Sequence, residues 1–228
     1  MKITDFENIK RFRANSDDTD THASRLRELE WLSSYISKGG YNLEFGVFSG
    51  TTINCLAKCL PEEHFYGFDS FEGLPEDWDM GEKNVKKEAF DRKGVLPDVE
   101  PNVTLIKGYF DKTINEWLKS QAENGYERPK GKHISYLHVD CDIYSSTKTI
   151  LDELNFMIVP GTIIRFDELS CWRYVFKEAT PSKISRVMYT TWKDHEWKAT
   201  QEWLKKYDRK VVPICRNWFQ SGTVVVTQ

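Results

Sequence analysis

The sequence predicts an α/β protein built on a mostly parallel sheet of seven strands, which closes with an antiparallel hairpin and carries helices on both faces. Short apolar runs alternate with amphipathic stretches along the chain, a pattern typical of strands buried by crossover helices. Near the C-terminus the alternation stops, because only the six residues RNWFQS separate two apolar runs. Six residues cannot form a helical crossover, so the last two strands are expected to be antiparallel.

The expected strands follow the apolar runs, and the expected helices follow stretches whose apolar residues share one face. Strands are placed at residues 41–48, 64–69, 103–110, 134–140, 161–167, 209–215 and 222–228. Helices are placed at residues 25–40, 51–60, 114–123, 145–158 and 195–207. The chain therefore divides into an N-terminal arm and helix at residues 1–40, whose first 24 residues read as a loose arm, and one domain at residues 41–228.

Charge and apolar content exclude several classes of partner. The net charge is -3, from 32 basic and 35 acidic residues without a long block of one sign, so no nucleic-acid partner is expected. The longest apolar stretch, FMIVPGTII, is too short to span a membrane and is broken by proline and glycine. The five cysteines lack CxxC spacing, and the first residues lack an apolar leader. We expect a cytoplasmic protein with a small-molecule partner, and its sequence is compatible with a homodimer.

Residues 72–101 do not fit the alternation of strands and helices. The segment is polar, rich in charge and long for a connection in a compact domain. It is either a solvated excursion of the surface or a lid over a binding site, because it begins where the second expected strand ends.

Glycines follow the first strand of the expected domain, in the stretch EFGVFSGTT. Ligands of open α/β sheets bind beyond the carboxyl ends of the strands. Gly46 would let the chain turn beneath a ligand, and Gly50 would allow close approach to a helix N-terminus, where free N–H groups favour a carboxylate or another anion. The spacing is not GxGxxG, which disfavours a nicotinamide cofactor.

An acidic residue follows the second strand at a spacing that suits ribose binding. Asp69 lies beyond Gly46 at close to the roughly 20 residues typical of such sites, although it could instead only cap a turn. The two motifs predict an adenosine-type ligand without a pyrophosphate cradle, and S-adenosylmethionine fits, with Gly108 and Tyr109 beside its adenine. The expected cofactor-binding residues are Glu44, Gly46, Phe48, Ser49, Gly50, Thr51, Thr52, Asp69, Ser70, Gly108, Tyr109 and Asp140.

Four acids follow the next two strands. Asp140 and Asp142 end the stretch YLHVDCD, and Asp167 and Glu168 end RFDE. Carboxylates that converge at adjacent strand tips repel one another unless a cation lies among them. Oxygen ligands without histidine or cysteine favour a hard ion, Mg²⁺ first or another divalent cation. The alternative is that each acid separately caps a helix.

The motifs EFGVFSG, DSFEGLP, DCDIYSST and FDE, in this order, resemble the macrocin O-methyltransferase (TylF-like) family of class I S-adenosylmethionine-dependent methyltransferases. The resemblance covers about residues 42–169, and DSFEGLP and DCDIYSST are its more specific parts. It implies a Rossmann-like class I fold and a metal-dependent O-methyltransferase, often of sugar hydroxyls. It also implies that Asp140, Asp167 and Glu168 ligate the metal, with Asp142, or else Asp140, as general base. The family usually has two aspartates on the fifth strand, and Glu168 replaces the second.

The expected chemistry is methyl transfer to a hydroxyl of a small molecule, a sugar or a glycosylated compound. A divalent ion would lower the pKa of the hydroxyl, and a carboxylate would take its proton. A catechol-type phenol O-methyltransferase needs similar carboxylates and is the alternative. An NAD(P)-binding oxidoreductase and a non-catalytic binding domain are further alternatives.

Four single positions carry expectations of their own. His138, inside the fourth strand, is expected to be packed and hydrogen-bonded rather than catalytic. Arg165, in an otherwise apolar strand, indicates a buried ion pair. Trp78 and Trp172 both lie next to the expected site loops.

Overall fold

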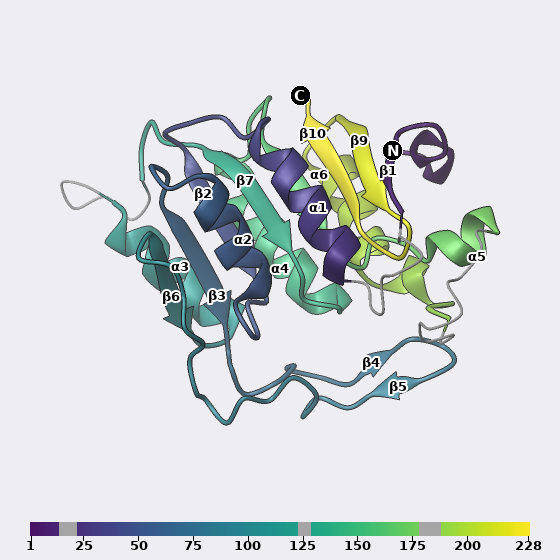
Figure 1. Ribbon diagram of the computed structural model, residues 1–228, viewed down its shortest axis with the longest axis horizontal. Coiled ribbons are helices and arrows are strands. Elements are labelled where there is room, and N and C mark those ends of the chain that lie inside the picture. The colour runs from purple at the N-terminus through teal and green to yellow at the C-terminus, as the bar shows by residue number, and fades with distance from the viewer. Residues whose placement is uncertain (14–21, 123–128, 178–187) are drawn as a thin grey trace.

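The computed structural model describes residues 1–13, 22–122, 129–177 and 188–228. Its main sheet has eight strands in the order β1-β9-β10-β8-β7-β2-β3-β6 (Figure 1). The strands are β1 (Lys10–Phe12), β2 (Tyr41–Phe45), β3 (Phe65–Asp69), β6 (Val103–Lys107), β7 (Ile134–Val139), β8 (Ile163–Phe166), β9 (Val211–Asn217) and β10 (Gly222–Val226). Of these strands only β10 is antiparallel to its neighbours, β8 and β9. This arrangement confirms the predicted mostly parallel sheet with a closing hairpin.

The eighth strand comes from the N-terminal arm. β1 pairs in parallel with β9, in a register that places Lys10 opposite Cys215. The arm therefore contributes a sheet edge in addition to its helix. A three-residue edge strand that begins with two basic residues has no apolar alternation, and charge is common on protected edges. Residues 14–21 of the expected loose arm lie outside the described residues.

The helices form two layers around the sheet. In Figure 1, α1 (His22–Ser33) and α2 (Thr51–Cys59) cover one face, and α3 (Phe110–Ser120), α4 (Tyr144–Leu154) and α6 (Glu196–Lys206) cover the other. Short helices lie at α5 (Trp172–Phe176), η1 (Ile3–Phe6), η2 (Asn155–Met157) and η3 (Trp192–Asp194). Among the described helices, none has the length and apolar character needed to cross a membrane.

Each helix layer buries one apolar stripe against the sheet. On α4, Ile150, Leu151 and Leu154 are fully buried, at the spacing that places them on one helical face. Ile53 and Leu56 of α2 are buried in the same way against the opposite face of the sheet. Burial of such a side chain contributes about 2 kcal/mol. These contacts hold the strands in register, so their carboxyl ends meet at one edge.

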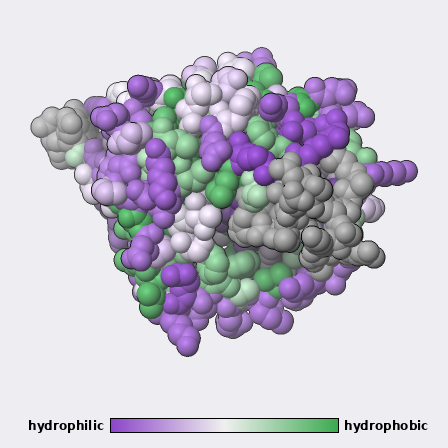
Figure 2. Space-filling model, viewed as in Figure 1, coloured by the Kyte–Doolittle hydropathy of each residue, from purple (hydrophilic) through white to green (hydrophobic). Residues whose placement is uncertain are grey.

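Residues 72–101 run along this carboxyl edge and contain a small hairpin, β4 (Trp78–Asp79) and β5 (Asn84–Val85) (Figure 1). The backbone N–H of Thr190 donates to the Met80 carbonyl at 3.0 Å. The Ser145 hydroxyl donates to the Glu76 carboxylate at 2.6 Å. The segment is thus held against the rest of the domain. On the face drawn in Figure 2, hydrophobic side chains lie between the sheet edge and this hairpin.

Candidate active site

A cavity of about 720 Å³ lies at the carboxyl edge of the sheet. The loops after β2, β3 and β7, the first turns of α3 and α4, and part of the 72–101 segment line it. Most of the lining is apolar, with polar groups from the strand ends. A volume of several hundred Å³ suits a nucleoside-sized ligand with a small second molecule.

The turn after β2 is tightly packed against the turn after β7. Gly46 has a φ of +95°, and a Cβ at this position would lie 1.6 Å from the carbonyl oxygen of Asp140. The two turns are joined to the sheet by backbone bonds from Gly46 N–H to the Phe68 carbonyl and from Asp140 N–H to the Phe45 carbonyl, each 2.9 Å. Only glycine fits here.

Asp69 fixes two loops of the cavity wall. One of its carboxylate oxygens accepts from the backbone N–H of Phe48 at 2.7 Å, and the other accepts from that of Phe71, also at 2.7 Å. Burial raises the pKa of Asp69, and these backbone bonds oppose that rise. Asp69 therefore stabilises a turn, as the capping interpretation expected. It also lines the cavity, as the ribose-binding interpretation requires.

In the turns that follow β2, β3 and β7, three residues other than glycine have left-handed backbone. They are Phe48 (φ 45°), Phe71 (φ 56°) and Asp142 (φ 65°). Such conformations are costly for residues with a Cβ and gather at functional sites. At Asp142 the unusual backbone sets the direction of a buried carboxylate.

Glu44 lies beneath the cavity rather than in its wall. It is 1% exposed, and it accepts from the Thr52 hydroxyl at 2.8 Å. Its other oxygen lies 2.9 Å from Nδ1 of His138. His138 is fully buried, which confirms its expected role as a packed, hydrogen-bonded histidine.

Most of the expected cofactor-binding residues meet at the cavity. Those in its wall are Gly46, Phe48, Ser49, Thr51, Thr52, Asp69, Ser70, Tyr109 and Asp140. Glu44, Gly50 and Gly108 are not in the wall. Both glycines nevertheless have positive φ, +79° and +139°, and shape the turns that precede α2 and α3.

Three of the four expected acids converge at the cavity floor. Each of Asp140, Asp142 and Glu168 offers a carboxylate oxygen, and these atoms lie within 4.8 Å of one another. Burial first, and neighbouring carboxylates second, raise the pKa of Asp140 to about 7 and those of Asp142 and Glu168 well above their usual range. Among the described residues, Oε2 of Glu168 has no hydrogen-bond partner. A cation would satisfy this oxygen, and an all-carboxylate set suits a hard divalent ion.

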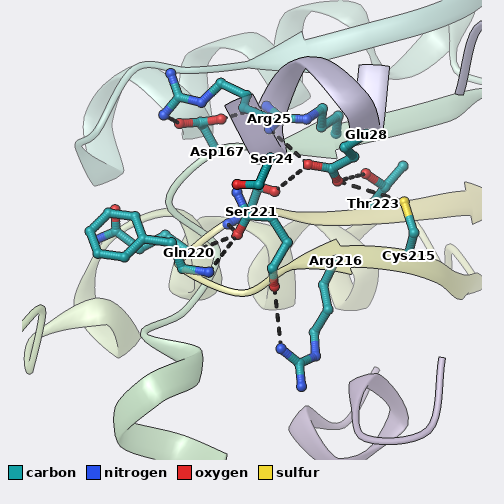
Figure 3. A network of polar contacts seen from close by, with 12 residues as sticks. Ser24, Arg25, Glu28, Asp167, Cys215, Arg216, Gln220, Ser221 and Thr223 are labelled. Carbon is teal, nitrogen blue, oxygen red and sulfur yellow. Dashed lines mark hydrogen bonds and ion pairs between the residues drawn. The ribbon is translucent and has the colours of Figure 1, made fainter. Parts of the chain in front are cut away.

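The fourth acid, Asp167, is not among the residues that line the cavity. Its carboxylate contacts Arg25 of α1 through Oδ2 (Figure 3). Its Oδ1 contacts Nη1 of Arg165 at 2.5 Å. Although burial opposes the change, the two guanidinium groups hold the pKa of Asp167 well below its usual range. Adjacent residues at a strand end alternate in direction, which separates Asp167 from Glu168. In a second group, Asp140, Asp167 and His138 each offer one ligand atom, and these three atoms also lie within 4.8 Å of one another.

A buried ion-pair network explains the charge inside β8. Arg165 is fully buried and pairs with Glu28 of α1 at 3.0 Å as well as with Asp167. Glu28 also accepts from the hydroxyls of Ser221 at 2.7 Å and Thr223 at 3.2 Å (Figure 3). The expected buried ion pair is therefore present.

Two residues of the site escaped sequence reasoning. Arg25 lines the cavity, and its Nη1 lies 3.7 Å from Oδ2 of Asp140. Glu196, at the start of α6, is fully buried and accepts from the backbone N–H of Glu168 at 2.9 Å. Neither lies in a motif, and each reaches the site from a helix distant in sequence. Only their charge within otherwise amphipathic helices could have indicated them.

The 72–101 segment supplies an apolar wall. Leu74, Trp78, Met80 and Phe90 line the cavity from this side. Trp78 is thus at the site, as its position in the sequence suggested. Trp172 is instead fully buried in the core, where its ring stacks on Phe176.

Comparisons with known proteins agree with this geometry. A sequence profile described as a methyltransferase domain matches residues 43–169. Because the match spans more than half of the chain, the protein belongs to this methyltransferase family, and it is an enzyme of the methyltransferase class. A search of curated protein sequences gave no significant match.

Solved structures of similar fold include several methyltransferases. The calicheamicin methyltransferase CalS11 has a TM-score of 0.58 at 18% identity, over 89% of this chain and 79% of that chain. The O-methyltransferase NovP has a TM-score of 0.53 at 18% identity, over 90% and 80% of the two chains. The methyltransferase PaMTH1 of Podospora anserina, solved with S-adenosylhomocysteine (SAH), has a TM-score of 0.52 at 16% identity, over 92% and 81%. At these identities the likeness establishes the fold, which is Rossmann-like.

Proposed function

We propose that the protein is an S-adenosylmethionine-dependent and divalent-metal-dependent O-methyltransferase of a small-molecule hydroxyl. The observation that carries the proposal is the meeting of Asp140, Asp142 and Glu168 in the same cavity as the glycine turn after β2. A methyl donor and an activated hydroxyl must lie together for transfer, and one cavity of about 720 Å³ can hold both. We also place the chain in the macrocin (TylF-like) branch, on the motifs in residues 42–169.

The cofactor is proposed to bind over the ends of β2 and β3. Gly46 permits close approach of the ligand, and the amino-acid end would face the N–H groups at the start of α2. Asp69 has both oxygens oriented by backbone bonds, and its remaining lone pairs can accept from ribose hydroxyls. Tyr109 is 38% exposed at the end of the cavity nearest β6, where it can border the adenine.

The metal is proposed to lie among Asp140, Asp142 and Glu168. The unpartnered Oε2 of Glu168 and the shared burial of the three carboxylates fit a hard ion such as Mg²⁺. When bound, the ion would lower the pKa of an acceptor hydroxyl. Glu196 holds the backbone of Glu168 and so fixes this end of the set.

Asp142 is proposed to accept the proton of the acceptor. A carboxylate has two oxygens, so one can face the cation while the other faces the hydroxyl. Its left-handed backbone and its burial fix the direction of the carboxylate, and burial also raises its pKa, which makes the carboxylate a stronger base. Asp140 is the alternative base.

The acceptor class is proposed to be a sugar or a glycosylated compound. CalS11 is described as a TDP-rhamnose 3'-O-methyltransferase, which supports a sugar hydroxyl. A catechol-type phenol is the second candidate, because Leu74, Trp78 and Met80 give the cavity an apolar wall that suits an aromatic ring.

A transfer assay separates these candidates. Purified protein would be incubated with methyl-labelled S-adenosylmethionine, Mg²⁺, and parallel panels of nucleotide sugars and of catechols. Methylated sugar that disappears with EDTA supports the proposal. Methylated catechol assigns the second candidate. Label transfer that survives EDTA unchanged would remove the metal from the mechanism.

The 72–101 segment is proposed to act as a lid. It supplies one wall of the cavity. Polar bonds at Glu76 and Met80 and an apolar cluster around Trp78 and Tyr189 hold it in the position that the structure shows, which would be its closed position.

A further inference from the structure

Arg25 provides a positive charge beside the acidic floor of the cavity. Figure 3 shows its side chain extending from α1 toward Asp167, and its other terminal nitrogen lies 3.7 Å from Oδ2 of Asp140. An arginine remains protonated at any pH that a protein tolerates. The position between these two strand ends is thus permanently cationic, whether or not a metal ion is present.

Both carboxylate oxygens of Asp167 already contact a positively charged side chain. Arg25 contacts Oδ2, and Arg165 contacts Oδ1 at 2.5 Å. Two charge-assisted bonds to guanidinium groups are among the strongest side-chain interactions. A metal that took Asp167 as a ligand would have to share an oxygen with a guanidinium group, whose positive charge repels the ion.

Helix α1 holds Arg25 in this position. Glu28, three residues further along the helix, pairs with Arg165 at 3.0 Å and accepts from Ser221 and Thr223 near and on β10. Arg25, Asp167, Arg165 and Glu28 therefore form a continuous chain of alternating charge. Two acids and two arginines neutralise each other. Among the described residues, the three acids of the cavity floor have only the longer contact of Arg25 with Asp140, at 3.7 Å.

We propose that Arg25 is a positioning residue that withdraws Asp167 from the metal and leaves the ion to Asp140, Asp142 and Glu168. This inference rests on the proposed metal-dependent function. It differs from the ligand set implied by the family resemblance, in which Asp167 is a ligand. Arg25 thereby selects which carboxylates bind the metal, although it does not itself bind it.

Metal affinity should respond to the loss of Arg25. Without this residue, the floor loses a charge that repels the ion, and Asp167 becomes free to turn toward it. Arg25→Met should therefore bind Mn²⁺ more tightly than the wild type, by about tenfold or more. A merely structural role for Arg25 predicts the opposite, because loosening of the site weakens metal binding.

The test is a double-mutant cycle of Arg25→Met and Asp167→Asn, with free Mn²⁺ measured by electron paramagnetic resonance. In the wild-type background, Asp167→Asn should weaken Mn²⁺ binding by less than about tenfold, since no ligand is lost. In the Arg25→Met background, Asp167→Asn should weaken Mn²⁺ binding by a factor at least about ten times larger than in the wild-type background. Arg25→Lys, which keeps the charge, should restore the small effect. SAH affinity and thermal unfolding report whether each variant is folded.

Three results overturn the inference. A loss of Mn²⁺ binding in Asp167→Asn alone that equals the loss in Glu168→Gln would make Asp167 an ordinary ligand, while the proposed function stands. Weaker Mn²⁺ binding by a folded Arg25→Met variant would make its role structural. Absence of Mn²⁺ binding by the wild type would remove the metal from both proposals. If Arg25→Met does not fold, the comparison of Asp167→Asn with Glu168→Gln still decides.

Discussion

The Cα of Gly46 faces the backbone carbonyl of Asp140 so closely that only a hydrogen atom fits between them. A Cβ on Gly46 would lie 1.6 Å from that carbonyl oxygen. The contact joins the turn that is proposed to bind the cofactor to the first carboxylate of the proposed metal set. The two halves of the site therefore share one rigid backbone contact.

Gly46→Ala should consequently destabilise the protein and abolish cofactor binding. The new methyl group would meet backbone, which cannot move aside without separating β2 from β7. Gly39→Ala is the matched control, because Gly39 also has a left-handed φ of +80°, but a Cβ added there would have no neighbouring atom within 4 Å. The control should cost only the conformational penalty of about 1–2 kcal/mol. Thermal unfolding and calorimetric titration with SAH measure both effects, and equal behaviour of the two variants would refute the steric explanation.

Asp142→Asn should reduce turnover far more than cofactor affinity. Asparagine keeps the size of the side chain but cannot accept the proton, so kcat should fall by about 100-fold or more. Asp208→Asn is a suitable control, because Asp208 also has left-handed backbone, φ 49°, and precedes β9 at the opposite edge of the sheet. Steady-state kinetics with the identified acceptor provide the measurement. Wild-type kcat in Asp142→Asn would transfer the role of base to Asp140.

Glu28→Gln should lower the stability of the whole fold. Glu28 is fully buried and is one of the two carboxylates that pair with Arg165, so its neutralisation removes part of the counter-charge of a buried guanidinium. Loss of one partner from a buried pair costs about 3–5 kcal/mol. Glu30→Gln, on the exposed side of the same helix, should stay within about 0.5 kcal/mol of the wild type. Urea unfolding distinguishes them, and a stable Glu28→Gln variant would show that the network is dispensable.

Cofactor should protect the 72–101 segment from trypsin if the segment is a lid. Lys86, Lys87 and Lys93 are cleavage sites within it. With SAH bound, cleavage there should slow several-fold, because a closed segment opens less often. Cleavage at the exposed Lys132, at the other edge of the sheet before β7, should not change. Mass spectrometry of timed digests gives the ratio, and an unchanged ratio argues for a fixed wall.

The strands that carry the site were predictable because their signals are local. Buried parallel strands appear as apolar runs, and the turns that need glycine or precede a helix follow directly after them. The carboxyl ends of such strands meet at one edge, so the sequence alone could bring Asp140 and Glu168 together. The closing hairpin followed from the length of a connection.

The remaining features depend on contacts between distant parts of the chain. Arg25 and Asp167 are 142 residues apart in the sequence, and nothing near either residue indicates the other. Asp167 is absent from the cavity lining, and its carboxylate contacts Arg25 and Arg165 instead. β1 was not predicted for a similar reason. Its three residues have no apolar alternation, and they form a strand only through pairing with β9.

The most direct test of the proposed function is a calorimetric titration of SAH and of Mg²⁺ into the wild type and into Asp140→Asn. Asp140 belongs to the metal set and contacts the cofactor turn through its backbone, which the substitution leaves intact. We expect both proteins to bind SAH and only the wild type to bind Mg²⁺. Absence of SAH binding by the folded wild type would contradict the assignment of the glycine turn and Asp69, and with it the proposed function.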